Sequence, residues 1–242
     1  MGYIATQVPQ ASGAGYAFRT SNEDRVAATF FGEGAASEGD FHSAMNFAAT
    51  LRSQTLFLCR NNKYAISTPT EDQYKSDGIS PRAIGYGMQS MKVDGNDAIA
   101  VYEAVKFARK HIVEHKEPFF IEFMTYRLGD HSTSDNSNLY RAESEKEVWA
   151  RQNNPILRLA SYLSKQNLKE TTDKEDESFR KNVRQEVIDM LRKCGEYKKP
   201  RVMDLFTDVY DKMTPNLIEQ ERELEEHLKT YADKYGLEHF DK

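Results

Sequence analysis

Two short apolar runs separated by an amphipathic stretch constrain the fold of this chain more than any other feature. Residues 26–31 and 55–59 show no polar alternation, which is typical of strands that are buried on both faces. Between them, Ser37 is placed to cap a helix, with Asp40 three positions further on. One apolar face at helical spacing then comprises Phe41, Ala44, Met45, Ala48 and Leu51. A strand, a helix and a strand in this order predict a parallel crossover unit, in which both strands end at the same edge of a sheet.

A weaker copy of this pattern follows along the chain. Residues 91–93 predict a short strand, residues 98–112 an amphipathic helix and residues 119–124 a buried strand. A helix rich in small residues is predicted upstream, at residues 8–19. We therefore expect a three-layer α/β fold with a mostly parallel sheet. From about residue 144 the composition changes to helices with charged faces, which predicts an α/β domain over residues 1–143 and a helical extension over residues 144–242.

Charge and hydropathy exclude several classes of protein. The chain has 33 basic and 38 acidic residues, a net charge of −5, and neither sign forms a long block. No nucleic-acid or membrane-surface partner is expected from such a balance. The apolar runs are far shorter than the ~20 residues that span a bilayer, so no membrane anchor is expected either. Cys59 and Cys194 form no disulfide framework, which favours a reducing compartment.

Polar turns follow the two strands of the first crossover unit. Gly32-Glu33-Gly34 comes after the first strand and Arg60-Asn61-Asn62 after the second. Such turns meet in the crevice where open α/β sheets bind ligands, and glycines together with a helix beginning just after Gly34 favour an anion there. Carboxylate and amide oxygens suit Mg²⁺. The turns therefore predict a Mg²⁺-diphosphate site, with the alternative that Glu33 only favours the positive end of the following helix.

The two turns, separated by residues 35–60, resemble the thiamin-diphosphate motif, in which a Gly-acid-Gly turn precedes an Asn-Asn pair. Longer stretches resemble the alpha subunits of the branched-chain 2-oxo acid dehydrogenases, the decarboxylase components of those complexes. This resemblance runs from about residue 5 to residue 242 and includes "CRNNKYAISTPT", "YGMQSMKVDGND" and "MTYRLGDHSTSD". The pyruvate dehydrogenase alpha subunits are similar in plan and are the second candidate.

The resemblance implies roles for particular residues. Mg²⁺ would be held by Glu33, Asn62 and the carbonyl oxygen of Tyr64, and Thr6 and Gln7 match a K⁺ site. The residues implied to contact thiamin diphosphate are Gly32, Glu33, Gly34, Ala35, Arg60, Asn62, Tyr64 and His131. A catalytic role at the edge of the reaction site is implied for His131, and Ser132 matches a serine that is phosphorylated in the family. For each of these residues a purely structural role is the alternative.

The resemblance also implies an activity and partners. The chain would decarboxylate branched-chain 2-oxo acids and pass the acyl group to a lipoyl carrier, with thiamin diphosphate, Mg²⁺ and K⁺ as cofactors. The implied partners are a beta subunit, two alpha with two beta, a lipoyl-bearing acyltransferase core, and a regulatory kinase and phosphatase in the mitochondrial matrix.

Family members carry a further amino-terminal part, so this chain is expected to be a truncated form that is inactive alone. A non-catalytic assembly chain is therefore a second hypothesis. A Mg²⁺-nucleotide binder is disfavoured because a Walker-type loop is missing.

Overall fold

The structure is a computed structural model that describes residues 4–169 and 171–241. It forms two compact units, Met1–Lys169 and Glu170–Lys242, which we describe separately. Helices α6 (Glu143–Gln152) and α7 (Pro155–Lys165) fall within the first unit. The units thus divide later than the change of composition at residue 144. The functional boundary between residues 143 and 144 stays a prediction.

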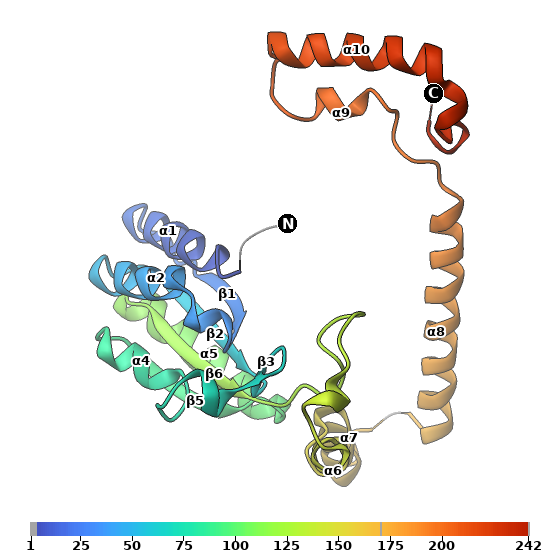
Figure 1. Ribbon diagram of the computed structural model, residues 1–242. Coiled ribbons are helices and arrows are strands. Elements are labelled where there is room, and N and C mark those ends of the chain that lie inside the picture. Colours follow the sequence, from blue (N-terminus) through green and yellow to red (C-terminus); the bar gives the residue numbers. More distant parts are fainter. Residues whose placement is uncertain (1–3, 170, 242) are drawn as a thin grey trace. The chain divides into compact units, whose positions relative to one another are not determined.

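A four-stranded parallel sheet forms the centre of the first unit, in the order β1-β2-β6-β5 (Figure 1). Its strands are β1 (Ala27–Gly32), β2 (Thr55–Asn61), β5 (Gln89–Asp94) and β6 (Phe119–Met124). All four lie where the sequence predicts strands. The second strand is longer than predicted, because its pairing with β6 continues through Arg60 and Asn61.

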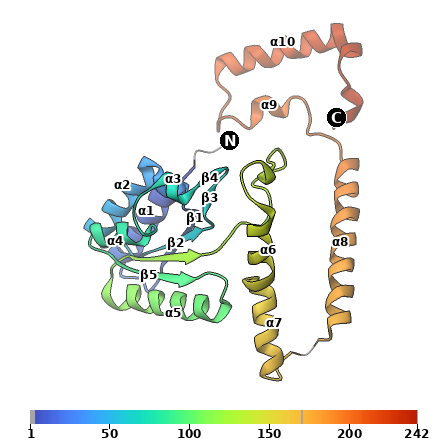
Figure 2. The same ribbon diagram turned by 60° about the horizontal axis from the view of Figure 1, so that its bottom comes forward.

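Helices cover both faces of this sheet (Figure 2). Helices α1 (Gln7–Thr20), α2 (Gly39–Thr50) and α4 (Ser80–Gly85) lie on one face, and α5 (Ala98–His115) lies on the other. The first face encloses a core that includes Phe41, Phe57 and Phe120, and the second encloses one that includes Leu58, Ile112 and Ile121. The predicted three-layer α/β fold is therefore confirmed.

The turn after β1 differs from the prediction. A single 3₁₀ turn, η1 (Ala35–Ser37), comes first, and α2 begins only at Gly39. The backbone N–H of Ser37 donates to the carbonyl oxygen of Gly34 inside this turn, and Glu38 occupies the cap position without a side-chain hydrogen bond. The predicted Ser37 cap is therefore wrong, and the helical structure that begins directly after Gly34 is a 3₁₀ turn, with the α-helix starting only at Gly39.

Short elements complete the first unit. Strands β3 (Tyr64–Ala65) and β4 (Thr68–Pro69) pair as a hairpin, followed by α3 (Thr70–Gln73), and η2 (Ser137–Leu139) precedes α6. The second unit contains α8 (Asp173–Glu196), α9 (Asp204–Thr207), α10 (Pro215–Tyr231), η3 (Ala232–Lys234) and η4 (Leu237–His239). Within residues 4–169 and 171–241, every helix is too short or too polar to cross a membrane.

Helix α1 packs so closely on β2 that one of its positions accepts only glycine. A Cβ added at Gly15 would lie 2.3 Å from Thr55 Oγ1 and 2.8 Å from the carbonyl carbon of Gln54. We expect Gly15→Ala to lower the free energy of unfolding of the first unit by about 1–3 kcal/mol, since overpacking must push the helix off the strand. Denaturant unfolding followed by circular dichroism measures this.

Gly13 provides the matched control on the same helix, because a Cβ there has nothing within 4 Å. Gly13→Ala is expected to be neutral or stabilising, since alanine has the higher helix propensity. Equal unfolding free energies for the two variants would contradict the close packing of α1 on β2.

Candidate functional site

The carboxyl edge of the sheet brings together the two residues on which the predicted cation site depends. Glu33 follows the end of β1 and Asn62 follows the end of β2. The backbone N–H of Asn62 donates to Glu33 Oε2 at 3.0 Å, although 29 positions separate the two residues in the chain. The pairing of β1 with β2 sets this juxtaposition, because Gly32 lies opposite Arg60 in the register.

Glu33 is a buried acid without an ion-pair partner in the described residues; its exposed fraction is 1%. Burial raises the pKa of its carboxyl group, and the hydrogen bond from Asn62 and the positive charge of Arg127 oppose this shift. A buried carboxylate is costly unless a positive charge or hydrogen bonds compensate it. The position therefore favours a bound cation.

Two successive side-chain hydrogen bonds shape the turn after β2. Asn61 Oδ1 accepts from the backbone N–H of Lys63 at 3.1 Å, and Asn62 Oδ1 accepts from that of Tyr64 at 3.2 Å. Both are the local bonds by which asparagine favours turns. Lys63 adopts a left-handed conformation with φ of 72°. The turn holds the Asn62 side chain and the Tyr64 main chain close to each other.

Arg127 approaches the same turn from the segment after β6. Its Nη1 donates to the carbonyl oxygen of Tyr64 at 3.2 Å, and its Nη2 donates to Ile66 O at 2.6 Å and to the Tyr140 hydroxyl at 2.7 Å. A carbonyl oxygen has two lone pairs, so the Tyr64 oxygen can accept this bond and still bind a cation. The sequence carries no periodic signal for Arg127, and the prediction omitted it.

Gly34 lacks a side chain and so leaves room for the neighbouring β3–β4 hairpin. A Cβ at Gly34 would lie 2.7 Å from the Cβ of Ala65 in β3. Gly34 has an ordinary right-handed conformation, with φ of −62°, so the need for glycine comes from this close approach. Ala35 begins the 3₁₀ turn directly after it. Gly34, directly after Glu33, is therefore packed against the hairpin that follows the turn after β2.

Arg60 lies on the other face of the sheet from Asn61, because successive side chains of a strand alternate. It borders a cavity of about 520 Å³ at the carboxyl edge, whose lining includes Arg60, Phe30, Val101, Phe123, Tyr126 and Trp149. The Arg60 side chain is exposed and makes no hydrogen bond or ion pair in the described part of the chain, while its main chain belongs to the sheet. Glu33, Asn62 and Tyr64 do not line this cavity.

Residues 127–141 form a loop that carries His131 and Ser132. The side chains of both residues are exposed, and Ser132 Oγ lies 3.2 Å from Ser134 Oγ. Asp135 Oδ2 accepts from the backbone N–H of His131 at 2.8 Å and from the Tyr140 hydroxyl at 2.7 Å. These bonds lower the pKa of Asp135. Within residues 4–169 and 171–241, His131 makes no hydrogen bond, ion pair or ring contact with Glu33 or Asn62.

Thr6 and Gln7 lie at the start of α1, beside β1. Gln7 Nε2 donates to the carbonyl oxygen of Phe30 at 3.0 Å, three residues before Glu33. This bond ties the helix to the strand that delivers Glu33. The K⁺ role of both residues stays a prediction.

The available donor set is made of oxygen atoms. In the described residues, no group of three or more His, Cys, Asp and Glu side chains could hold a metal ion. Glu33, Asn62 and the Tyr64 carbonyl instead provide one carboxylate, one amide and one main-chain oxygen. Mg²⁺ accepts such a partial set and completes it with phosphate oxygens and water. The residues therefore fit a phosphate-bound Mg²⁺.

Comparison with known proteins identifies relatives over nearly the whole chain. A family model described as "Dehydrogenase E1 component" matches residues 1–203. The 2-oxoisovalerate dehydrogenase subunit alpha, mitochondrial, of Homo sapiens is 49% identical over 239 residues, 99% of this chain and 53% of the relative. The Dictyostelium discoideum protein of the same name is 51% identical over 238 residues, 98% of this chain and 54% of the relative. The chain thus spans about half the length of the curated relatives it matches.

Proposed function

Because the chain belongs to the family of dehydrogenase E1 components, we propose that it is the alpha subunit, or the greater part of one, of a thiamin-diphosphate-dependent 2-oxo acid dehydrogenase. Its substrates are branched-chain 2-oxo acids, whose acyl group passes to a lipoyl carrier after decarboxylation. The names of the relatives, which carry the 2-oxoisovalerate dehydrogenase designation, support this substrate class over pyruvate.

One observation carries the proposal: the buried carboxylate of Glu33 lies against the backbone N–H of Asn62. A structural acid at a strand end would be expected in water or in an ion pair. Glu33 is neither exposed nor paired among the described residues. Its hydrogen bond to the turn that carries the Asn62 side chain and the Tyr64 carbonyl supports a ligand role for Mg²⁺.

The residues at the site would have different roles in binding the cofactor. Glu33, Asn62 and the Tyr64 carbonyl would hold Mg²⁺, and the exposed guanidinium of Arg60 would neutralise the diphosphate in the two-pronged geometry that arginine offers. Gly32, Gly34 and Ala35 would let the main chain approach the cofactor. When bound, thiamin diphosphate supplies the carbon chemistry that releases CO₂. His131, on its exposed loop, would reach the edge of the reaction site from the segment after β6.

Partners complete the proposal. A beta subunit supplies the remaining half of the reaction site in an assembly of two alpha and two beta subunits, and a lipoyl-bearing acyltransferase accepts the product. A kinase and a phosphatase act on Ser132, and K⁺ bound near Thr6 and Gln7 braces β1. The mitochondrial designation of relatives from human, slime mould and plant supports the mitochondrial matrix as the location.

Co-expression with a beta subunit tests the function. The purified complex is titrated calorimetrically with thiamin diphosphate in Mg²⁺ and then assayed with 2-oxoisovalerate and with pyruvate. Binding followed by decarboxylation of 2-oxoisovalerate supports the proposal. Preference for pyruvate would assign the chain to the other group, and a stable complex without cofactor binding or turnover would assign it to assembly.

A second experiment tests the regulatory role of Ser132. Ser132→Glu adds a negative charge beside His131, where diphosphate would lie. Two like charges about 10 Å apart at an effective dielectric constant of about 20 repel by roughly 1.7 kcal/mol, which corresponds to about 17-fold in affinity. We expect an affinity loss of this order for thiamin diphosphate, measured by calorimetry. Ser132→Ala is the control and should bind normally, whereas equal affinity of both variants would contradict the role.

A further inference from the structure

Glu122 interrupts the buried strand β6 with a charge. The exposed fraction of Glu122 is 0%, and its neighbours in the strand are apolar. Glu122 lies opposite Cys59 in the register with β2. Asn61, two residues further along β2, therefore projects from the same face of the sheet as Glu122. Glu122, a buried acid, thus lies beside Asn61, the residue that precedes Asn62.

Both oxygens of Glu122 are used as acceptors. Oε1 accepts from Asn61 Nδ2 at 2.8 Å and from the backbone N–H of Ile79 at 2.9 Å. Oε2 accepts from the N–H of Ile79 at 3.0 Å and from that of Ser80 at 2.8 Å. Only donors surround the group, which is what a buried carboxylate requires. Glu122 therefore joins the end of β2 to the segment before α4.

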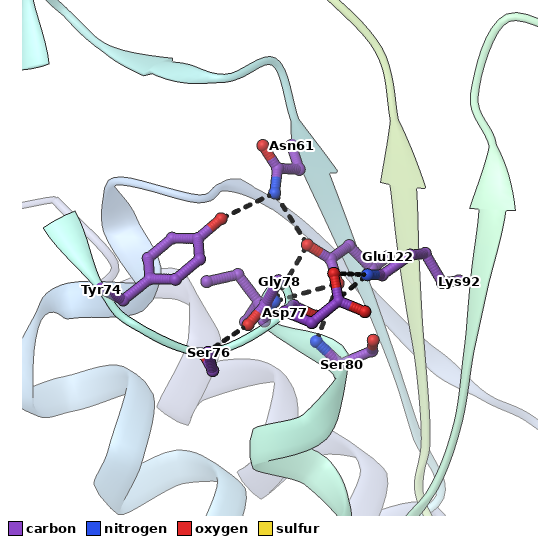
Figure 3. A network of polar contacts seen from close by, with 9 residues as sticks. Asn61, Tyr74, Ser76, Asp77, Gly78, Ser80, Lys92 and Glu122 are labelled. Atoms are coloured by element: carbon purple, nitrogen blue, oxygen red, sulfur yellow. Dashed lines mark hydrogen bonds and ion pairs between the residues drawn. The ribbon is translucent and has the colours of Figure 1, made fainter. Parts of the chain in front are cut away.

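The segment before α4 closes tightly on this carboxylate. Gly78 has φ of +85°, and a Cβ there would lie 2.6 Å from Glu122 Oε2. Lys92 in β5 donates to Asp77 Oδ1 at 2.8 Å on the same segment (Figure 3). The main chain before α4 lies on one side of the Glu122 carboxylate and Asn61 lies on the other. The carboxylate therefore has little freedom to move.

The amide of Asn61 is consequently held in one orientation. Its Nδ2 donates to Glu122 Oε1 and to the Tyr74 hydroxyl, the latter at 3.0 Å. A carboxylate accepts hydrogen bonds only, so the NH₂ end must face Glu122 and the oxygen must face Lys63. That oxygen accepts the Lys63 N–H that closes the turn. A rotated amide would place an NH₂ group against this N–H and open the turn.

We propose that Glu122 is a positioning residue for the cation site: it fixes the Asn61 amide, which closes the turn that sets Asn62 against Glu33. Its consequence for Mg²⁺ rests on the proposed function: when the turn opens, Mg²⁺ should bind more weakly. The structural step from Glu122 to the turn can be measured without any cofactor. Glu122 acts through Asn61 and does not itself reach the cation ligands.

Exchanging the acid at position 122 with the amide at position 61 tests the contact between Glu122 and Asn61. Glu122→Gln keeps an oxygen for the Ile79 and Ser80 N–H groups but presents an NH₂ group to Asn61, so two donors face each other. The double variant Glu122→Gln with Asn61→Asp reverses the polarity of the pair. Its new carboxylate at position 61 would accept from the new amide at position 122, from the Tyr74 hydroxyl and from the Lys63 N–H. The swap also conserves the net charge.

Amide hydrogen exchange of the full chain without metal is the first readout. Glu122→Gln should speed exchange at Asn62 and Lys63 by about tenfold or more, the equivalent of losing one hydrogen bond to a charged group. Amides in the middle of β2 should be unaffected, and the double variant should restore slow exchange at Asn62 and Lys63. A structural role limited to global stability would instead change all core amides together.

Mg²⁺ affinity is the second readout, measured with thiamin diphosphate in the complex with the beta subunit by the fluorescence of Trp149, the only tryptophan of this chain. Lys63 Nζ lies 5.1 Å from the Trp149 ring, so this residue reports on the turn. Glu122→Gln should weaken binding about 10–100-fold, the usual effect of losing a group that orients a ligand. The swap should restore most of the affinity.

Asp77→Asn is the matched control, since it disturbs the same segment without touching Glu122 or Asn61. It should leave both readouts at wild-type values, and effects equal to those of Glu122→Gln would overturn the proposal. Unchanged exchange at Asn62 and Lys63 in Glu122→Gln, or a swap that restores nothing, would also overturn it. A wild-type complex with the beta subunit that fails to bind Mg²⁺ with thiamin diphosphate would refute the proposed function, while the exchange readout would still decide the role of Glu122.

Discussion

Glu33→Gln is expected to weaken Mg²⁺-dependent binding of thiamin diphosphate by more than about 100-fold, because losing a ligand exceeds the 10–100-fold effect of losing a group that only orients one. Glutamine keeps the shape and an acceptor oxygen for the Asn62 N–H, so the turn itself should persist. Calorimetric titration in the presence of the beta subunit measures the loss. Glu38→Gln, the same change at an exposed acid five residues later, is the control and should bind normally.

The same substitution is expected to stabilise the chain without metal. Burial raises the pKa of Glu33, so the folded chain binds this proton more tightly than the unfolded chain does. That contribution to stability is complete below the unfolded pKa and is lost as the pH rises through the raised folded pKa. The glutamine variant has no such ionisation and so does not lose this stability. The unfolding temperature of Glu33→Gln should therefore exceed that of the wild type at neutral pH, and the two temperatures should become similar in acid. A lower unfolding temperature at neutral pH would contradict the account of Glu33 as a buried acid whose desolvation is only partly compensated.

Arg141→Ala is expected to lower the free energy of unfolding by about 3 kcal/mol or more, because hydrogen bonds to charged groups contribute roughly 1.5–3 kcal/mol each. The Arg141 side chain is buried and donates to the carbonyl oxygens of Arg127 and Gly129. Its guanidinium also faces the rings of Tyr64 and Tyr126, each at 5.3 Å from the ring centroid. Denaturant unfolding gives the free energy.

Hydrogen exchange locates the effect of Arg141→Ala. Residues 127–141 should lose protection first, because Arg141 holds both ends of this loop. Arg151→Ala, at an exposed arginine in the last turn of α6, is the matched control and should change the stability little. Comparable losses for the two variants would contradict the anchoring role of Arg141.

The strands, though not every strand end, were predictable from the sequence because their physical signals are local. Residues 119–124 form an unbroken apolar run apart from one glutamate, and the structure has a strand over the same residues, Phe119–Met124. The convergence of Glu33 on Asn62 followed from topology, since parallel strands joined by a crossover end at one edge. Neither conclusion required knowledge of side-chain packing.

Other features depend on contacts between distant segments, which no local pattern reports. A 3₁₀ turn at Ala35–Ser37 stands where a helix cap was predicted. It follows Gly34, which Ala65 of β3 approaches closely. Arg127 reaches Tyr64 across 63 positions of the chain. Glu122 did give a signal, since a charge inside an otherwise apolar buried strand is rare. Its partners Asn61 and Ile79, however, could not be read from that signal.

Crystallography with Mn²⁺ in place of Mg²⁺ tests the central claim most directly. The complex with the beta subunit is crystallised with thiamin diphosphate, and anomalous scattering locates the metal. We predict a peak bonded to a Glu33 carboxylate oxygen, to Asn62 Oδ1 and to the carbonyl oxygen of Tyr64, at about 2.0–2.2 Å, close to the distances of Mg²⁺. A cofactor-loaded crystal with its metal bound elsewhere, and with Glu33 still bonded only to the Asn62 N–H, would contradict the account.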